Sequence, residues 1–376
     1  MAEPRAIEPS DLKPRLERAY EFAARQVRAT IDRTPDFFPM YTVEGRWKHG
    51  GELWTDWCAG FHAGMMWLLA GRTGDPRWRA DAEHYSRLIE HKQHDRDVHD
   101  LGFIFLNTYK PWYEQSGDPR LRDVLIQAGR TLALRFNPRG RYLRSFVAPE
   151  SLFIDIMVNV PIIFDAARAT GDRALYDLAV AHCRTTERTI VRADGGTAHE
   201  GTFDAATGAF LHESTHQGLR PDSDWTRGLA WSLYGFGTVY TYTNDPADLA
   251  VARRNADHFL ARLDDSFVPP WDFDAADAPA IADSSAGAIA ASGLWNLSTM
   301  LVAIDPAAAD RYRRGALSIL DALLTDDFTA WSTPGWEGVL KHGVYHFHKN
   351  LGVDESVMWG DFFFLEAIDK VLRAAG

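Results

Sequence analysis

A short turn motif recurs along this chain and limits the folds that are open to it. The copies read TGDP at 73–76, SGDP at 116–119, TGDR at 170–173 and TNDP at 243–246, with a looser IDPAAAD at 304–310. Gly or Asn can take the left-handed conformation that ends a helix, Asp can cap the next helix, and Pro suits that helix's first turn. Each copy therefore predicts a tight connection between two helices, and the series predicts a chain of αα-hairpins.

Between these turns, apolar residues recur with the 3.6-residue period of a helix. We expect helices at 11–32, 59–72, 76–92, 102–116, 119–134, 154–170, 174–189, 226–242, 247–263, 285–300, 306–324 and 355–373. The segments 59–72 and 285–300 are apolar nearly all round and should be buried on every side, whereas 76–92 has a wide charged face. Pairing of buried with amphipathic helices predicts two concentric rings, an all-α (α/α)6 barrel of about six αα-hairpins.

Two further patterns bear on how the chain is organised. In 190–215, β-branched and aromatic residues alternate around Asp-Gly-Gly and Ala-Thr-Gly turns, which predicts a small β-hairpin insertion. No linker rich in Pro and Ser divides the chain, so we expect residues 1–376 to form a single domain. The functional site is then expected at one mouth of the barrel, among the loops between helices and the starts of inner helices.

Charge and composition exclude several classes of partner. A net charge of −12 argues against binding to nucleic acid or to an anionic membrane surface. The N-terminal stretch lacks the apolar core of a secretory signal, and no uncharged apolar run approaches the ~18 to 20 residues that span a bilayer. The two cysteines lack the spacing of a zinc site and are too few for a disulfide framework. We expect a soluble cytoplasmic protein, either a monomer or a small homo-oligomer.

The chain is also rich in aromatic residues, with 13 Trp, 21 Phe and 12 Tyr. Many of them stand beside Gly, Asp, His or Arg and not within aliphatic runs. Flat aromatic faces pack against the C–H faces of sugar rings while polar neighbours bind the hydroxyls, so the pattern is typical of a carbohydrate-binding cavity. A core rich in tryptophan is the alternative.

A charged cluster, HDRDVHDLGFIF at 94–105, precedes one of the expected inner helices. Its acids and histidines lack the HxxxH or HExxH spacing that places two ligands on one helical face, so we expect no metal and no cofactor here. We interpret His94 to Asp97 as a solvated loop. Asp100 lies immediately before the apolar helix, where it either caps that helix or presents a carboxylate at the barrel mouth.

Asp155 lies inside a nearly continuous apolar run, SLFIDIMVNVPIIFDAAR at 151–168. Aspartate is rarely buried without a partner, and Phe153 and Ile154 before it make a capping role less apt. Burial would raise its pKa and suit it to carry a proton near neutral pH; a hydrogen-bonded core aspartate is the alternative. With Asp100 it resembles a glycosidase carboxylate pair, and we expect the two to face one cavity within about 10 Å.

A third polar cluster spans ESTHQGLRPDSDWTRGLAWSLYGF at 213–236. Groups suited to bind a ligand gather around the start of its predicted helix: His216, Gln217, Trp225, Arg227 and Trp231. Arg227 is the leading candidate to bind a carboxylate, because its planar guanidinium matches that anion in two hydrogen bonds. An ion pair at the surface with Asp222 or Asp224 is the alternative.

Together these stretches resemble the unsaturated glucuronyl hydrolases of glycoside hydrolase family 88. The matching motifs are HDLGF at 99–103, DIMVNVP at 155–161, THQG and DSDWTRGLAWSLYGF within 215–236, WDFDAADAPAIADSSAGAIAASGLWNLS at 271–298 and GVDESVMWGDFFFLEAI at 352–368. They follow one another in order from about residue 40 to the end of the chain. A series of matches in order is far more specific than any one motif.

The resemblance implies an (α/α)6 barrel that acts, without a metal, on the 4,5-unsaturated uronate at the non-reducing end of oligosaccharides left by polysaccharide lyases. The family's reaction begins with hydration of the C4=C5 vinyl ether and not with attack at the anomeric carbon. Asp155 matches the family's general acid/base, and Asp100 matches its second carboxylate. The positions that match substrate-binding residues are His99, His199, Gln217, Trp225, Arg227 and Trp231.

Two stretches depart from the family pattern. WTDWCAGFHAG at 54–64 is longer than the family's usual WTxGFW; Trp54 is the best match for its stacking tryptophan, and Trp57 is the competitor. The loop KHGVYHFHK at 341–349 has Lys349 but none of the serines that mark members preferring sulfated disaccharides. We therefore expect unsulfated unsaturated oligosaccharides as substrates at least as much as sulfated ones.

Other activities share the barrel. An unsaturated rhamnogalacturonyl hydrolase performs a similar hydration on pectin fragments, although HDLGF favours the glucuronyl family. A sugar 2-epimerase, from a different class, would use paired histidines for proton transfer. A sugar-binding module without catalysis would not need a buried Asp155.

Overall fold

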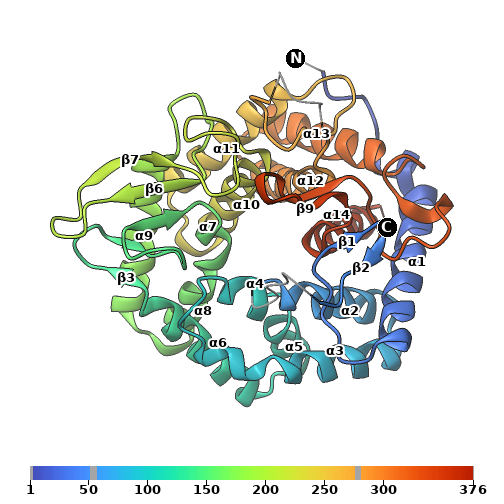
Figure 1. The fold of residues 1–376 in the computed structure, drawn as a ribbon, viewed down its shortest axis with the longest axis horizontal. Coiled ribbons are helices and arrows are strands. Elements are labelled where there is room, and N and C mark those ends of the chain that lie inside the picture. The colour runs from blue at the N-terminus through green and yellow to red at the C-terminus, as the bar shows by residue number, and fades with distance from the viewer. Residues whose placement is uncertain (1–2, 51–56, 276–280, 376) are drawn as a thin grey trace.

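The computed structural model describes residues 3–50, 57–275 and 281–375 and confirms the expected (α/α)6 barrel (Figure 1). The inner ring consists of α2 (Ala59–Thr73), α4 (Leu101–Phe105), α7 (Ile156–Asn159), α10 (Thr226–Thr243), α12 (Ser284–Leu301) and α14 (Met358–Ala374). Each of these helices contacts the next, and α14 closes the ring on α2. Outside them lie α1 (Pro9–Arg33), α3 (Pro76–Leu88), α6 (Pro119–Ala133), α9 (Arg173–Ile190), α11 (Pro246–Arg262) and α13 (Pro306–Leu323).

The recurrent turns work as their residues predict. Gly74, Gly117, Gly171 and Asn244 end their helices in the left-handed conformation, with φ between 50° and 70°. The aspartates that follow accept the backbone N–H near the start of the next helix: Asp75, Asp118, Asp172, Asp245 and, in the looser copy, Asp305. Helix direction thus reverses through purely local chemistry.

Two expected inner helices are interrupted. The segment 102–116 divides into α4 and α5 (Tyr109–Ser116), because Asn107 and Thr108 turn their side chains onto the carbonyls of Phe103 and Ile104. The segment 154–170 divides into α7 and α8 (Pro161–Thr170), since proline has no N–H to continue the ladder. The expected helix at 76–92 likewise ends at Leu88 and is followed by the 3-10 turn Glu90–His94.

The chain forms more strands than the sequence pattern predicts. The hairpin expected within 190–215 is present as β6 (Glu200–Phe203) and β7 (Phe210–Ser214), but β5 (Ser151–Phe153) pairs with β6 and makes a three-stranded sheet. Further short hairpins are β1 (Thr42–Val43) with β2 (Arg46–Trp47), β3 (Phe136–Asn137) with β4 (Tyr142–Leu143), and β8 (Gly343–His346) with β9 (Leu351–Glu355). Because β9 uses residues up to 355, the last helix begins at Met358 and not at 355.

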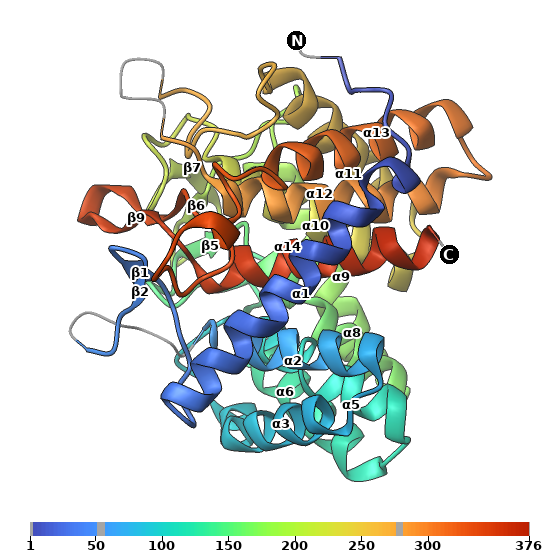
Figure 2. The same ribbon diagram turned by 90° about the vertical axis from the view of Figure 1, so that its right-hand side faces the viewer.

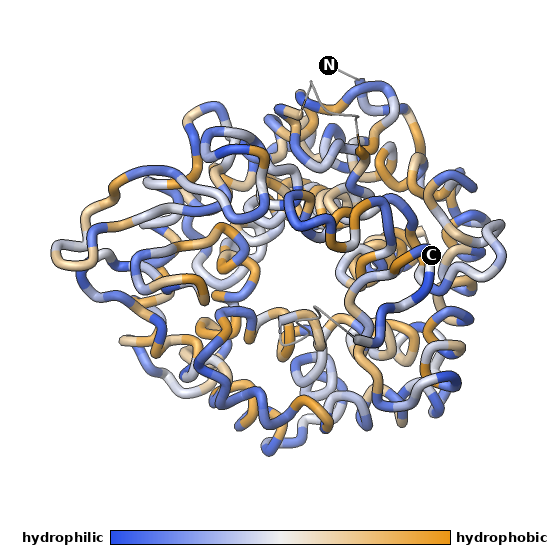
Figure 3. The backbone as a smooth tube through the Cα atoms, in the orientation of Figure 1, coloured by the Kyte–Doolittle hydropathy of each residue, from blue (hydrophilic) through white to orange (hydrophobic). Residues whose placement is uncertain are grey.

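Strands and polar loops gather at one end of the barrel, as the side view in Figure 2 shows for β1, β2, β5, β6, β7 and β9. In Figure 3 hydrophobic colour prevails around α14, whereas the outer helices alternate between blue and orange as amphipathic helices do. One cluster of buried apolar side chains extends from Leu12 to Leu372. None of the helices in the described ranges combines the length and apolar character needed to cross a bilayer.

Candidate active site

A cavity of about 230 Å³ opens among the starts of the inner helices. It is lined by Trp57, His99, Asp100, Phe146, Phe153, Asp155, His216, Gln217, Trp225, Arg227, Trp231, Tyr345, His346, Lys349 and Leu351. Aromatic rings thus enclose two carboxylates, a buried arginine and a set of histidines. This is the polar and aromatic lining expected of a site that holds a sugar.

Asp100 stands at the N-cap position of α4, yet its side chain makes no capping hydrogen bond. The amide of Phe103, which an N-cap side chain would usually bind, donates instead to Asn159 Oδ1 of α7 at 2.8 Å. Gly102 permits this approach, because a Cβ there would lie 2.4 Å from the Asn159 Cα. The capping alternative for Asp100 is therefore wrong: its carboxylate faces the cavity and is only 3% exposed.

Asp155 owes its place to the three-stranded sheet. β5 carries the chain toward α7, and the Ile154 N–H donates to the carbonyl of His199 at 3.0 Å just past the paired strands. Asp155 then occupies the N-cap position of α7, again without a capping hydrogen bond from its side chain. Asn159 ties this turn down through its side-chain N–H to the Asp155 carbonyl. The same asparagine thus fixes both helices that carry the carboxylates.

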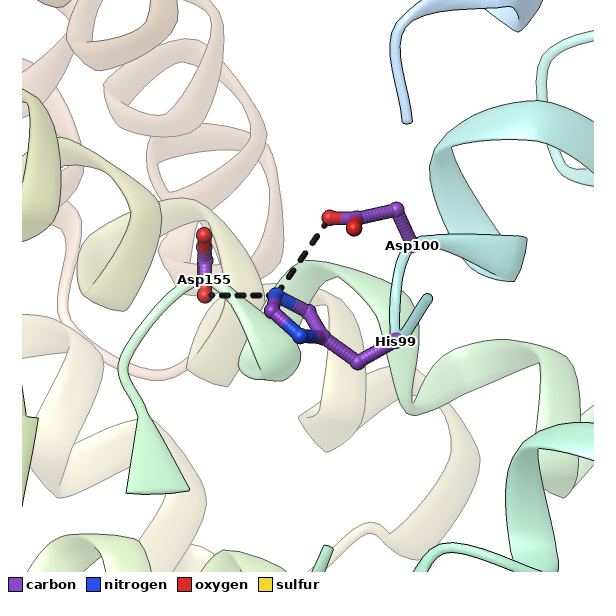
Figure 4. A group of neighbouring side chains, drawn as sticks. All are labelled: His99, Asp100 and Asp155. Atoms are coloured by element: carbon purple, nitrogen blue, oxygen red, sulfur yellow. Dashed lines mark ion pairs between the residues drawn. The ribbon is translucent and has the colours of Figure 1, made fainter. Parts of the chain in front are cut away.

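His99 lies between the two carboxylates (Figure 4). Its Nε2 is 3.5 Å from Asp100 Oδ1 and 3.4 Å from Asp155 Oδ1, and the three side chains offer ligand atoms within 4.8 Å of one another. The expectation that Asp100 and Asp155 share a cavity within about 10 Å is confirmed. These distances are longer than those of ordinary hydrogen bonds, so the three side chains lie close together without being held by strong hydrogen bonds to one another.

Two carboxylates and an imidazole could also hold a divalent cation. However, His99 Nδ1 accepts the N–H of Phe146 at 3.1 Å, so the neutral ring carries its proton on Nε2 and points it at the carboxylates. A protonated Nε2 has no lone pair for a metal. The geometry fits a proton-sharing group better than a metal centre.

The electrostatics of the two carboxylates differ. Burial raises the pKa of Asp100 to about 7; His99 opposes this rise, and the nearby Asp155 adds to it. Burial also pushes the pKa of Asp155 upward, but His99, His199 and Arg227 outweigh it and hold that pKa below its usual value. The expectation of a raised pKa at Asp155 is therefore wrong for this structure; the raised pKa belongs to Asp100.

Arg227 forms another part of the cavity wall and is 2% exposed. Its Nη1 lies 3.4 Å from Asp283 Oδ2 and also donates to the carbonyl of Val344, while Nη2 donates to the carbonyl of Tyr345 and to Gln217 Oε1. The surface pairing with Asp222 or Asp224 is wrong, because Asp222 pairs with Arg220 and Asp224 pairs with Arg192 and His258. Most of the guanidinium N–H groups are thus already bound to the protein.

Gln217 also lines the cavity, whereas His199 contacts Gln217 without being part of the lining itself. Because Gln217 Oε1 accepts from Arg227, its amide NH2 remains to donate toward the cavity that it lines. His199 packs on Trp225, with ring centroids 4.4 Å apart, and its Nδ1 accepts the backbone N–H of His216 and Gln217 at 3.1 Å. His199 Nε2 has no hydrogen-bond partner among the described residues. Burial lowers the pKa of His199 to about 3, so the ring is a neutral donor at Nε2.

The remaining expected residues fall into three groups. Trp225, Trp231 and Lys349 line the cavity as expected. Trp54 lies outside the described residues, whereas its competitor Trp57 lines the cavity, 4.6 Å from Trp359 between ring centroids. The solvated loop is confirmed, since His94, Arg96 and Asp97 are exposed and Asp95 is half-buried.

Sequence reasoning missed several residues of the site. Phe146 and the neighbouring pair Tyr345 and His346 line the cavity, and Asp283 is the counter-ion of Arg227. Three histidines and two aromatic residues within KHGVYHFHK were a visible sign that this loop reaches the cavity. Asp283 looks like an ordinary N-cap in sequence and does cap α12, which hides its second role.

Comparisons with known proteins agree with this geometry. The model of glycosyl hydrolase family 88 matches residues 28–268. An unsaturated glucuronyl hydrolase of Formosa agariphila is 31% identical over 326 residues, covering 84% of this chain and 80% of its own.

Two solved structures extend the comparison. The unsaturated glucuronyl hydrolase of Bacillus sp. GL1 has a TM-score of 0.89 at 29% identity, covering 96% of this chain and 97% of its own. A variant of the Streptococcus agalactiae enzyme complexed with dGlcA-GalNAc6S has a TM-score of 0.82 at 27% identity, covering 98% and 93%.

Proposed function

The chain belongs to glycosyl hydrolase family 88, and we propose that Asp155 and Asp100 are the carboxylates that carry out its reaction. It is a glycosidase that removes an unsaturated uronic acid from oligosaccharides. The family match and the named relatives favour this activity over an unsaturated rhamnogalacturonyl hydrolase or a sugar 2-epimerase. The observation that carries the catalytic assignment is the pair of buried carboxylates bridged by His99 Nε2.

The proposed reaction is hydration of the C4=C5 vinyl ether. Asp155 gives a proton to C4, which leaves positive charge shared between C5 and the ring oxygen. Asp155, now ionised, takes a proton from the water that adds to C5, and the resulting hemiketal opens and releases the remaining sugar. Asp100, close to both His99 and Asp155, supports the positive charge and exchanges the proton within the group.

In this structure the pKa of Asp155 is held low, and bound substrate would raise it. Arg227 and His199 help to hold the pKa of Asp155 low. A uronate carboxylate bound beside them, by the Gln217 amide NH2 and the His199 Nε2–H, would offset their effect and raise the pKa of Asp155. The residue would then be protonated when substrate is present, which is the state that a proton donor to carbon requires.

The other expected contacts have separate tasks. Trp225 and Trp231 offer aromatic faces to the sugar ring, and Trp54 stays the proposed stacking residue although it lies outside the described residues. Lys349 adds a positive charge at the cavity wall for the substrate's anionic groups. His99 orients the two carboxylates.

Asp155→Asn tests the assignment. We expect kcat to fall at least about 100-fold, because the amide cannot donate the proton, while substrate binding is kept. The assay follows the near-ultraviolet absorbance of the unsaturated uronate, and calorimetry measures binding. Asp97→Asn, at an exposed carboxylate of the neighbouring loop, is the matched control and should retain activity. Undiminished turnover by Asp155→Asn would exclude its role.

We further propose that residues 1–376 act as one catalytic domain, as a monomer or small homo-oligomer in the cytoplasm. The large cluster of buried apolar side chains that extends from Leu12 to Leu372 supports the first point. Two buried cysteines that form no disulfide suit a reducing compartment. Sedimentation of the purified chain and fractionation of its source cells would test these proposals.

A further inference from the structure

Arg135 is a half-buried cation that the proposed reaction does not use. It follows α6 and donates to three backbone carbonyls: Nη1 to that of Arg96, Nε to that of Arg144 and Nη2 to that of Ser145. It therefore joins the loop before His99 to the segment that connects β4 with β5. A guanidinium suits this role, because its planar fork of N–H groups can bind several carbonyls at fixed angles.

The peptide group between Ser145 and Phe146 has hydrogen bonds at both of its ends. Its carbonyl accepts from Arg135, and its N–H donates to His99 Nδ1 at 3.1 Å. The rings of Phe146 and His99 also stack, with centroids 5.4 Å apart and planes 20° from parallel. A continuous chain of hydrogen bonds thus extends from Arg135 through this peptide group to His99, whose Nε2 faces the two carboxylates (Figure 4).

Hydrogen bonds in such a chain strengthen one another. A cation at the carbonyl end polarises the peptide group and makes its N–H a better donor. Because Nδ1 of His99 accepts this N–H, the proton of the neutral ring stays on Nε2. A second proton could enter the ring only at Nδ1, where the peptide N–H already occupies the lone pair. The chain therefore opposes the charged form of His99.

The carboxylates around His99 favour that charged form. Burial lowers the pKa of His99, but Asp100 and Asp155 outweigh burial and hold this pKa above its usual value; Arg135 acts against them and lowers it. A charged His99 would hold Asp155 ionised more firmly, and Asp155 could then not give a proton to C4. The other titratable side chains on which His99 acts are buried neutral histidines: His182 and His199. The charged groups that act on Arg135 itself are Arg144, Asp100, Asp97 and Asp95.

We propose that Arg135 is a positioning residue of the reaction, and that it acts through the Ser145–Phe146 peptide group to keep His99 neutral with its proton on Nε2. The proposal rests on the function proposed above for the two carboxylates. Arg135 is not one of the described residues that line the cavity, so its effect on the substrate has to pass through His99.

Arg135→Gln tests the proposal, because it removes the charge and leaves one donor group for three carbonyls. We expect kcat at neutral pH to fall about tenfold or more with KM changed less than threefold, as is typical when a residue that orients an active-site histidine is lost. The acid limb of the pH profile should move to higher pH, since removal of a cation raises the pKa of His99. The limb from Asp100 should move the same way, because Arg135 also lowers the pKa of Asp100. The assay follows the near-ultraviolet absorbance of the unsaturated uronate.

Nitrogen NMR of the protein with isotope-labelled histidine measures the position of the proton directly. The signals of His99 are assigned by their loss in His99→Gln. In the wild-type protein at neutral pH, Nδ1 should be unprotonated and Nε2 protonated. In Arg135→Gln the ring should take up its second proton at a higher pH. This measurement needs no substrate, so it is independent of the proposed function.

Arg144→Gln is the matched control. Arg144 is a half-buried arginine of the same segment, but it donates to the carbonyls of Leu134 and Arg135 instead of that of Ser145. Its loss should leave kcat and the titration of His99 as in the wild-type protein. Arg135→Lys keeps the charge on a single nitrogen, so it should restore most of the His99 titration and part of kcat. Thermal unfolding checks that each variant is folded.

Three outcomes would overturn the proposal: a wild-type His99 protonated on Nδ1, a His99 titration that Arg135→Gln leaves unmoved, or an equal loss of kcat in Arg144→Gln. If Arg135→Gln does not fold, Arg135→Lys decides, because wild-type kcat in a variant that cannot bind all three carbonyls would contradict the proposal. Absence of turnover by the wild-type protein would instead contradict the proposed function, and the NMR titration would still test the role of Arg135.

Discussion

The two walls of the cavity satisfy their polar groups in opposite ways. On the acidic wall, His99 Nε2 lies 3.5 and 3.4 Å from the two carboxylates, and Asp155 Oδ1 has no hydrogen-bond partner in the described part of the chain. On the basic wall, Arg227 is held by two backbone carbonyls, the Gln217 amide and Asp283. The difference corresponds to two roles. The carboxylates and His99, which transfer protons, are held loosely, whereas Arg227, which provides a fixed positive charge, is held firmly.

This contrast predicts different consequences for damage to each wall. Loss of a loosely held group should impair the chemical step with little cost in stability. Loss of a firmly held partner should mainly lower the stability of the protein and its affinity for the substrate.

The largest effect is expected for Asp100→Asn on the acidic wall. We expect kcat to fall by about 100-fold or more, because the variant can neither support positive charge nor exchange the proton. The pH profile gives a second measurement. Ionisation of Asp100, with its pKa of about 7, should contribute a limb to the wild-type profile that an asparagine cannot produce. A profile that keeps this limb in Asp100→Asn would show that another group titrates there.

A smaller effect, mainly on stability and KM, is expected for Asp283→Asn on the basic wall. Asp283 is fully buried and Arg227 is 2% exposed, so the variant leaves a buried cation without its counter-ion. Breaking a buried pair typically costs about 3 to 5 kcal/mol, and KM should rise as Arg227 loses its position.

Denaturant unfolding and steady-state kinetics measure these changes. The control is Asp222→Asn, whose partner Arg220 is at the surface and whose loss should hardly be measurable. Equal stability of Asp283→Asn and Asp222→Asn would contradict the contrast between the walls.

The smallest effect concerns how much the buried Asp100 lowers the stability of the folded protein. Its folded pKa is raised to about 7, above the value of an unfolded chain, so it favours the folded state most when protonated. Its effect on stability therefore becomes unfavourable as the pH rises from about 3.9, the usual pKa of an unfolded Asp, to about 7, and stays constant above that. Asp100→Asn should therefore raise the melting temperature at pH 8 by roughly 2 °C or more, with little effect near pH 4. Calorimetry at both pH values tests the sign; a lower melting temperature at pH 8 would contradict it.

Many features of the fold and of the site could be predicted from short stretches of the sequence. Helix ends at Gly74, Gly117 and Gly171 followed from the turn motif, because capping and left-handed glycine depend on a few neighbouring residues. The pairing of Asp100 with Asp155 followed from two acids placed alike at the starts of inner helices. The breaks before Tyr109 and Pro161 were missed, since the apolar period runs straight through both.

The parts of the site that escaped prediction depend on contacts far apart in the chain. The Arg227 guanidinium meets Asp283, 56 positions away, and the carbonyl of Val344, 117 positions away. His346 carries no local sign that both of its ring nitrogens would be buried without a hydrogen-bond partner among the described residues. The spacing of residues in the sequence does not indicate which backbone carbonyls will accept hydrogen bonds from an arginine.

The sequence by itself determined the succession of helices, the turns between them and the two acids at the barrel mouth, because these rest on periodicity and capping within a few residues. Only the tertiary structure decided that Asp100, and not Asp155, has the raised pKa, and that Arg227 is bound by the protein on several sides. The physical reason is that desolvation and charge interactions depend on distance in space, which a fold sets only when its distant segments have packed together.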